Sequence, residues 1–198
     1  MRKIPFLVAS LLAVAMPLAA QSHALTISGR GGGFSALTNL NDGSNASDFK
    51  TGYNLGGGVG LQVHRNVTLR GDFTFARAKF RDAGVTTDDH FNKFFYTAAI
   101  QLQHPTSSGF MPYVFVGGGG VTIKEKGAPN GQNVEKTKGA GVGGIRLAYQ
   151  VPRSRWSIFA EGTGYLYKVN NLSGTLAGFD KTQFDAAWSG GVSYAIGL

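Results

Sequence analysis

The sequence predicts an all-β fold, an eight-stranded antiparallel up-and-down transmembrane β-barrel, and three observations support this prediction. Eight segments alternate apolar and polar residues with the two-residue period of a β-strand. The connections between these segments alternate between short turns and long polar loops. The chain contains 30 glycines, many of them inside the alternating segments. Because glycine is unfavourable inside helices, this distribution also argues against a helical fold.

The first 24 residues predict a cleaved secretory signal peptide. Arg2 and Lys3 precede an apolar run over residues 4–20, and small residues allow cleavage after Ala20 or Ala24. A single membrane anchor is the less favoured interpretation, because a spanning helix needs roughly 20 apolar residues and a proline interrupts this run. The barrel domain is therefore expected over residues 25–198.

The first four predicted strands each separate an apolar face from a polar face. Large apolar residues lie at every second position, and glycine, hydroxyl, amide or charged residues lie between them. We expect the apolar faces to point outward and Arg30, Arg70 and Asp72 to point inward. The four segments are LTISGRGGGF (25–34), YNLGGGVGLQVH (53–64), VTLRGDFTF (67–75) and FFYTAAIQLQ (94–103).

The last four predicted strands keep the same period, and three of them place Arg146, Glu161 and Asp185 on the polar face. Residues 111–123 are ambiguous because both faces are apolar. For this strand we expect the outward residues to be Tyr113, Phe115, Val121 and Ile123. The four segments are MPYVFVGGGGVTI (111–123), IRLAYQV (145–151), WSIFAEGTGYL (156–166) and QFDAAWSGGVSYAIGL (183–198).

The connections indicate which ends of the strands lie together. Three are short, over residues 64–66, 105–109 and 152–155. An even number of strands with short turns at one end and long loops at the other is typical of bacterial outer-membrane barrels. A soluble, lipocalin-like barrel with its apolar face inside is the alternative, which the aromatic residues near the strand ends disfavour. The long loops are TNLNDGSNASD (38–48), RDAGVTTDDH (81–90), KEKGAPNGQNVEKTK (124–138) and KVNNLSGTLAGFDK (168–181).

Composition and charge restrict the function further. The chain has no cysteine, which excludes disulfides and thiolate metal sites. Without Arg2 and Lys3, 17 of the 19 basic residues remain against 11 acidic ones, a net charge of +6. These basic residues form no nucleic-acid-binding motif, and an exported protein is not expected to bind nucleic acid.

Six charged residues on the polar faces predict an interior charge network. Eight strands enclose a space just wide enough for side chains, and a buried charge is costly unless it is paired. We therefore expect a salt-bridged plug, whereas the inward glycines leave a narrow pore as the alternative. The residues are Arg30, Arg70, Asp72, Arg146, Glu161 and Asp185.

The remaining basic residues predict a lipid contact. Eleven lysines and arginines, Lys93 among them, lie at or just beyond the long-loop ends of the strands. Such a collar suits the phosphates of lipopolysaccharide, although interleaved acidic residues also fit an ordinary solvated rim. The main candidates are Lys79, Arg81, Lys124, Lys126, Lys136 and Lys138.

Three stretches make the sequence resemble a known family. MPYVFVGGGG (111–120), GAGVGGIRLAYQV (139–151) and SYAIGL (193–198), together with the signal peptide, resemble the small eight-stranded outer-membrane barrels, including the OmpA transmembrane domain, OmpX/Ail and opacity-type surface proteins. The resemblance implies that the barrel-assembly machinery reads a C-terminal signal at Tyr194, Ile196 and Leu198. Most members end in phenylalanine, whereas this chain ends in leucine.

These observations predict a structural surface protein of a Gram-negative outer membrane that stabilises the envelope through lipopolysaccharide, with adhesion to a host or surface ligand left open. A small, low-conductance porin is the alternative. A lipid A-modifying enzyme comes third, because a hydrolase needs a base, a nucleophile and an orienting acid within reach of one another. Of the four histidines only His90 is expected near the outer rim, so we expect no catalytic residues, metal or cofactor.

Overall fold

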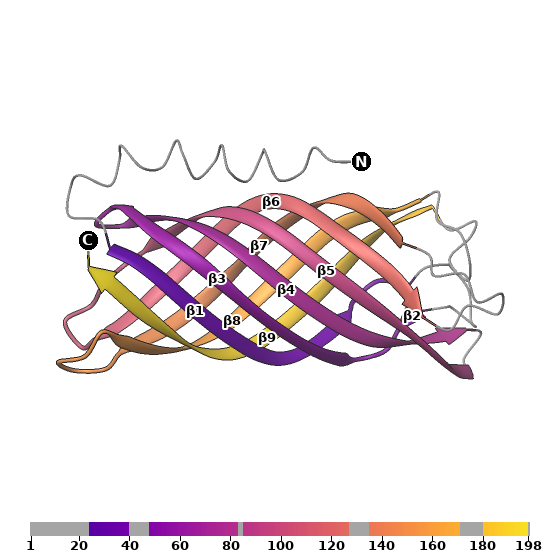
Figure 1. Cartoon of the computed structure of the whole chain (residues 1–198), viewed down its shortest axis with the longest axis horizontal. Coiled ribbons are helices and arrows are strands. Elements are labelled where there is room, and N and C mark those ends of the chain that lie inside the picture. The colour runs from indigo at the N-terminus through magenta and orange to yellow at the C-terminus, as the bar shows by residue number, and fades with distance from the viewer. Residues whose placement is uncertain (1–23, 40–47, 83–84, 127–134, 171–179, 198) are drawn as a thin grey trace.

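The computed structural model describes residues 24–39, 48–82, 85–126, 135–170 and 180–197. In these ranges eight long strands and one two-residue strand form a closed antiparallel sheet (Figure 1). The strands are β1 (Ala24–Ala36), β2 (Asp48–Phe49), β3 (Gly52–His64), β4 (Val67–Asp82), β5 (Val85–Gln103), β6 (Phe110–Lys126), β7 (Glu135–Gln150), β8 (Trp156–Val169) and β9 (Lys181–Gly197). No helix in the described ranges is long and apolar enough to cross a membrane.

The barrel closes between its first and last strands, so the predicted eight-stranded antiparallel fold is confirmed. Long strands that are neighbours in the chain pair with each other, and β1 pairs with β9 from Ala24 opposite Gly197 to Ala36 opposite Asp185. The short strand β2 pairs with the C-terminal end of β4, away from the short turns. Figure 1 shows the start of β1 and the end of β9 side by side, at the end of the barrel that carries the short turns.

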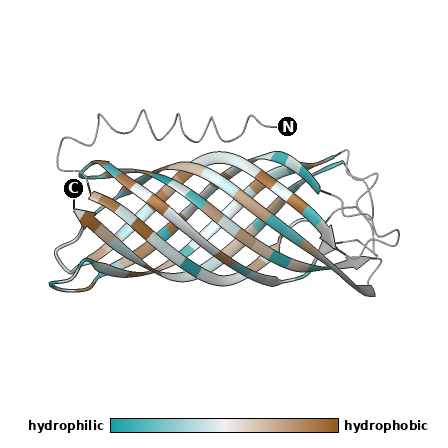
Figure 2. Ribbon diagram, in the orientation of Figure 1, coloured by the Kyte–Doolittle hydropathy of each residue, from teal (hydrophilic) through white to brown (hydrophobic). Residues whose placement is uncertain are grey.

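The outer surface of the barrel is apolar. Outward side chains such as Leu55, Val116 and Ile145 are 56%, 70% and 66% exposed. Along the strands in Figure 2, apolar residues alternate with more polar ones, as the two-residue period predicts. A water-soluble monomer rarely exposes a large contiguous apolar surface, whereas a band of this kind faces lipid in outer-membrane barrels.

The expected orientation of residues 111–123 is wrong. In β6 the side chains of Phe115, Val121 and Ile123 are buried, and Tyr113 lines the interior. Periodicity does not select a face when both faces are apolar. The register selects it here, because Phe115 lies opposite the inward Gln101 of β5.

The expectation that residues 81–90 form a loop is also wrong. Strand β4 continues to Asp82 and β5 begins at Val85, with Arg81 opposite Thr86 and a register irregularity before it. Backbone hydrogen bonds form a ladder whatever the side chains are, so two polar segments extend the sheet beyond its apolar belt. The other three expected loops lie mostly outside the described residues.

Two of the short turns contain left-handed backbone. Gly109 has a φ of 83° and donates its N–H to the carbonyl of Thr106 at 3.2 Å, which closes the turn between β5 and β6. Glycine adopts this conformation without a steric penalty. Arg153, between β7 and β8, adopts a φ of 58° although it carries a side chain.

Candidate functional site

Five of the six charged residues expected inside the barrel meet in one cluster, called here the arginine network: Arg30, Arg70, Asp72, Arg146 and Glu161. They come from β1, β4, β7 and β8, and their side chains are at most 9% exposed. Asp72 accepts hydrogen bonds from Arg30 and Arg70, each at 2.6 Å. Strands distant in the sequence are thereby joined across the lumen.

Glu161 is the centre of the arginine network. Its carboxylate accepts from Arg70 Nη1 at 3.0 Å and forms an ion pair with Arg146 Nη2 at 2.6 Å. The hydroxyl of Thr163 donates to it at 3.0 Å, and Arg30 lies 3.6 Å away. Burial makes each charge costly alone, so these partners stabilise one another.

Two phenylalanine rings support the arginines, and each ring lies over a glycine. The guanidinium of Arg70 lies 4.2 Å from the ring centre of Phe115, and that of Arg146 lies 4.0 Å from the ring centre of Phe159. Phe115 is opposite Gly144, and Phe159 is opposite Gly191. A Cβ at either glycine would collide with the ring, so the glycines make room for the aromatic support.

Asp185 lies apart from the arginine network, in a second buried pair. Its carboxylate accepts from Lys93 Nζ at 2.8 Å and from the Tyr167 hydroxyl at 2.7 Å. The side chains of Lys93 and Asp185 are 1% and 0% exposed. The expectation that Lys93 belongs to the outer rim is wrong. Extending the alternation of residues 94–103 back by one position would have found it, since it shares the face of Phe95.

An aromatic layer separates the two charged clusters. Phe95 stacks on Tyr165 with ring centres 4.0 Å apart, and Phe34 and Tyr167 lie 6.2 and 6.1 Å from Phe95. Along β8, Tyr165 of this layer comes after Glu161 of the arginine network. The next inward residue, Tyr167, binds Asp185. The lumen therefore contains two barriers in series, one ionic and one aromatic.

The expected lipopolysaccharide contacts divide between the two faces of the wall. Lys79 and Lys124 continue the outward register of β4 and β6. Lys136 and Lys138 share the register of the inward residues Ile123 and Val121, and Lys138 Nζ donates to Asn170 at 2.7 Å. Arg81 and Lys126 lie in strands, but their side chains are outside the described part of the structure.

An outward aromatic patch in β3, β4 and β5 lies next to some of these cations, on their short-turn side. Its rings form a continuous series of contacts with centres 5.2–6.2 Å apart. At the next outward position after Phe75 and Phe94, Arg77 and Lys124 flank Asn92 in adjacent register, and Arg77 is also opposite Tyr53. Lys124 Nζ also lies 5.5 Å from the ring centre of Phe94. The patch consists of Tyr53, Phe73, Phe75, Phe94 and Tyr96.

The expected assembly signal lies on the strand that closes the barrel. The Tyr194 ring packs against Trp156 with centres 4.9 Å apart, and Ile196 is opposite Leu25 of β1. Leu198 lies outside the described residues. Recognition of this segment by the assembly machinery stays a prediction.

No cluster of three or more histidine, cysteine, aspartate or glutamate side chains suited to a metal occurs in the described ranges. His64 and His104 are exposed at the short-turn end. The side chain of His90 and the whole of His23 lie outside the described residues. The expectation of no enzymatic activity stays a prediction.

Comparison with solved structures identifies the architecture. Neisserial surface protein A aligns with 87% of this chain and 96% of its own, with a TM-score of 0.57 and 14% sequence identity. The chain has the fold of an outer-membrane β-barrel. OprG from Pseudomonas aeruginosa aligns with 89% of this chain and 97% of its own, with a TM-score of 0.54 and 12% identity. Ail, the attachment invasion locus protein of Yersinia pestis, aligns with 88% of this chain and 99% of its own, with a TM-score of 0.52 and 18% identity. No family model matches the sequence, and no curated protein matches it.

Proposed function

We propose that this protein is a surface barrel of a Gram-negative outer membrane that stabilises the envelope by binding lipopolysaccharide. The observation that carries the proposal is the position of three cations, Arg77, Lys79 and Lys124, called here the basic row. They lie on the outward register of β4 and β6, just beyond Phe75 and Phe94 of the aromatic patch. Lipid A has acyl chains next to phosphates, and this part of the wall offers apolar rings next to cations.

The geometry of the basic row suits the boundary between lipid and water. Long basic side chains place their aliphatic stems along apolar surface and their charges at the head-group level. Lys124 does this over Phe94, and it also forms an exposed ion pair with Glu135 at 3.0 Å. Exposed ion pairs contribute little stability, so Lys124 can exchange this carboxylate for a phosphate at small cost.

The filled interior favours this structural role over a porin. The arginine network and the aromatic layer occupy successive levels of the lumen. Adhesion through the long loops concerns residues that lie mostly outside the described ranges. The proposal therefore rests on the lipid-facing wall.

Binding to lipid A with and without phosphates tests the proposal. The protein is purified from membranes in neutral detergent and titrated with fluorescent diphosphoryl lipid A or its dephosphorylated form. Wild type should prefer the diphosphoryl form. Changing Arg77, Lys79 and Lys124 together to glutamine should weaken that binding on the order of 100-fold, because each surface cation contributes about 1 kcal/mol to anionic-lipid attraction.

A matched control removes the same charge at the opposite end of the barrel. Arg65, Arg153 and Arg155 lie in the short turns, and their change to glutamine should leave the preference intact. Equal losses of affinity in both triple variants would mean that the preference depends only on net charge. An unchanged preference in the basic-row variant would overturn the proposal.

A further inference from the structure

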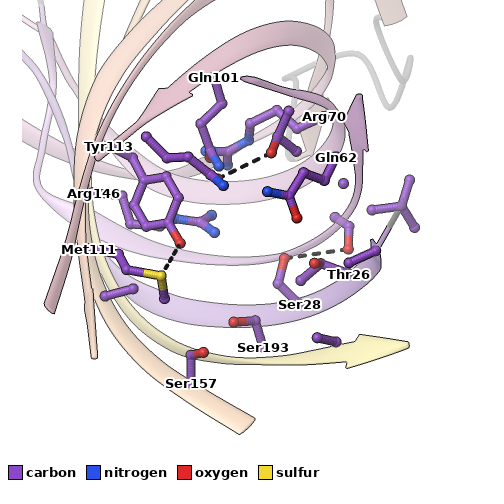
Figure 3. A pocket seen from close by; sticks show the side chains of 18 of the residues that line it. Thr26, Ser28, Gln62, Arg70, Gln101, Met111, Tyr113, Arg146, Ser157 and Ser193 are labelled. Atoms are coloured by element: carbon purple, nitrogen blue, oxygen red, sulfur yellow. Dashed lines mark hydrogen bonds between the residues drawn. The ribbon is translucent and has the colours of Figure 1, made fainter. Parts of the chain in front are cut away.

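A polar cavity lies between the arginine network and the short-turn end of the barrel. It has a volume of about 150 Å³ and is lined from all around the wall, by Thr26, Gln62, Gln101, Tyr113, Arg146 and Ser193 among others (Figure 3). Glutamines at its mouth bond to the carbonyls of the short turns in solvent-exposed contacts, Gln62 and Gln103 both to Arg65. The cavity therefore communicates with water on the side where the chain ends.

The inner wall of this cavity carries an excess positive charge. The arginine network contains three guanidinium groups and two carboxylates, which leaves one positive charge without a balancing partner. The Lys93–Asp185 pair is neutral as a whole and lies beyond the aromatic layer. A buried charge of this kind is stabilised by an anion that can reach it.

The surplus charge is available at Arg146. Its Nε and Nη2 both bind Glu161, at 2.7 and 2.6 Å, and Phe159 covers one face of the guanidinium. Among the described residues, Nη1 has no hydrogen-bond partner. The Arg146 side chain is only 9% exposed, and it points into the cavity in Figure 3.

Further donors line the same space. Gln101 accepts from Arg70 through its carbonyl oxygen, and within the described ranges its amide nitrogen has no partner. The hydroxyl of Ser193 is likewise without a side-chain partner there, and the Tyr113 hydroxyl makes only a long contact of 3.5 Å with the sulfur of Met111. Asp72 also lines the cavity, but both of its oxygens accept from arginines.

We propose that this cavity binds one small monoanion, a halide or a short carboxylate, with Arg146 as its main ligand and Gln101 and Ser193 as neutral donors. The single surplus charge selects a singly charged species. A cavity of about 150 Å³ can hold a molecule the size of benzene, so this one admits chloride, formate or acetate and is too small for sugar acids and nucleotides. The anion would complete the charge balance of the plug from the short-turn side.

Titration followed by nuclear magnetic resonance tests the proposal. The ¹⁵N-labelled protein, purified from membranes in neutral detergent, is titrated with sodium formate, sodium chloride or the bulky monoanion gluconate at constant sodium concentration. Formate and chloride should cause saturable shifts of the Gln101 side-chain amide and the Arg146 backbone amide. Gluconate should not, and the side chain of Asn66 in a short turn should report only general salt effects.

Three variants assign the site. Arg146→Gln should raise the dissociation constant at least about tenfold, since a hydrogen bond to a charged donor is the strongest contact available. Gln101→Leu and Ser193→Ala keep every charge of the arginine network and should each raise it about two- to tenfold. Arg153→Gln, in a short turn, is the control and should change nothing.

The proposal fails if no small anion gives saturable shifts in the wild type. It also fails if gluconate shifts the same resonances with the same affinity, because the response then reports charge screening. Should Arg146→Gln not fold, equal affinities in wild type, Gln101→Leu and Ser193→Ala would contradict the proposal by themselves.

Discussion

Glu161 shows most clearly how single residues hold the lumen closed. It lies within ion-pair distance of Arg30, Arg70 and Arg146, which come from three other strands. The interior contains more cations than anions at this level, so each carboxylate has several partners. Loss of this carboxylate leaves adjacent guanidinium groups facing one another.

We predict that Glu161→Gln strongly destabilises the barrel. Removing one partner of a buried ion pair costs about 3–5 kcal/mol, because the remaining charge stays buried. Urea-induced unfolding, followed by the different gel mobilities of folded and unfolded barrel, measures the change. The control is Glu135→Gln, whose exposed pair with Lys124 should contribute less than about 1 kcal/mol. Equal effects of the two changes would mean that the arginine network contributes no more stability than an exposed ion pair.

The alternation of the sequence predicts the wall at residue level but not the contacts inside it. It places Arg30, Arg70 and Glu161 in the lumen, where the structure also has them. It does not predict that Asp185 belongs with Lys93, because that pairing depends on the height of each strand in the barrel. Nor does it orient Phe115, since the strand is apolar on both faces.

At the level of the strands, inward glycines and inward phenylalanines depend on each other. Phe159 of β8 lies over Gly191 of β9, and its ring also packs against the guanidinium of Arg146. Rings that cover glycines on a neighbouring strand are a known means of stabilising sheets. Here the same ring also fixes the height of a buried charge.

We predict that Gly191→Ala destabilises the barrel, whereas Gly29→Ala does not. A Cβ at Gly191 would collide with the Phe159 ring and with the carbonyl of Gly29 across the pairing of β1 and β9, while a Cβ at Gly29 meets nothing within 4 Å. Overpacking of this kind costs about 1–3 kcal/mol, and a compatible glycine-to-alanine change can add about 0.4–1 kcal/mol. The shift in the urea midpoint measures both. A stable Gly191→Ala barrel would show that Phe159 can move without loss.

The lengths of the strands were harder to predict than their number. The apolar rhythm marks only the part of a strand that contacts lipid, so it ends near Phe75 in β4. The structure continues β4 to Asp82 and β5 from Val85, because polar residues form the same backbone ladder. The outer part of the barrel is thus absent from any prediction based on hydropathy.

For the whole molecule, two barriers in series predict a barrel that does not conduct. Ions would have to pass the arginine network and then the stacked rings of Phe95 and Tyr165. Planar-bilayer recording of the wild type should show no discrete steps, and the double change of Phe95 and Tyr165 to alanine should stay silent because the arginine network remains. Steps in the wild type would support a porin, and steps only in the double variant would show that the aromatic layer alone seals the lumen.

The pairing of β1 with β9 has a consequence for how fast the barrel can form. It places Ala24 opposite Gly197 and Ala36 opposite Asp185, so it connects nearly the whole described chain end to end. Contacts between residues so far apart in sequence are slow to form, because the entropy of closing the intervening chain is lost before they stabilise anything. At Gly31 opposite Gly190 this pairing also lacks a side chain on both strands. Before closure, both strands expose unpaired N–H and C=O groups that hydrocarbon cannot solvate. We therefore expect the pairing of β1 with β9 to be the last and slowest step of folding.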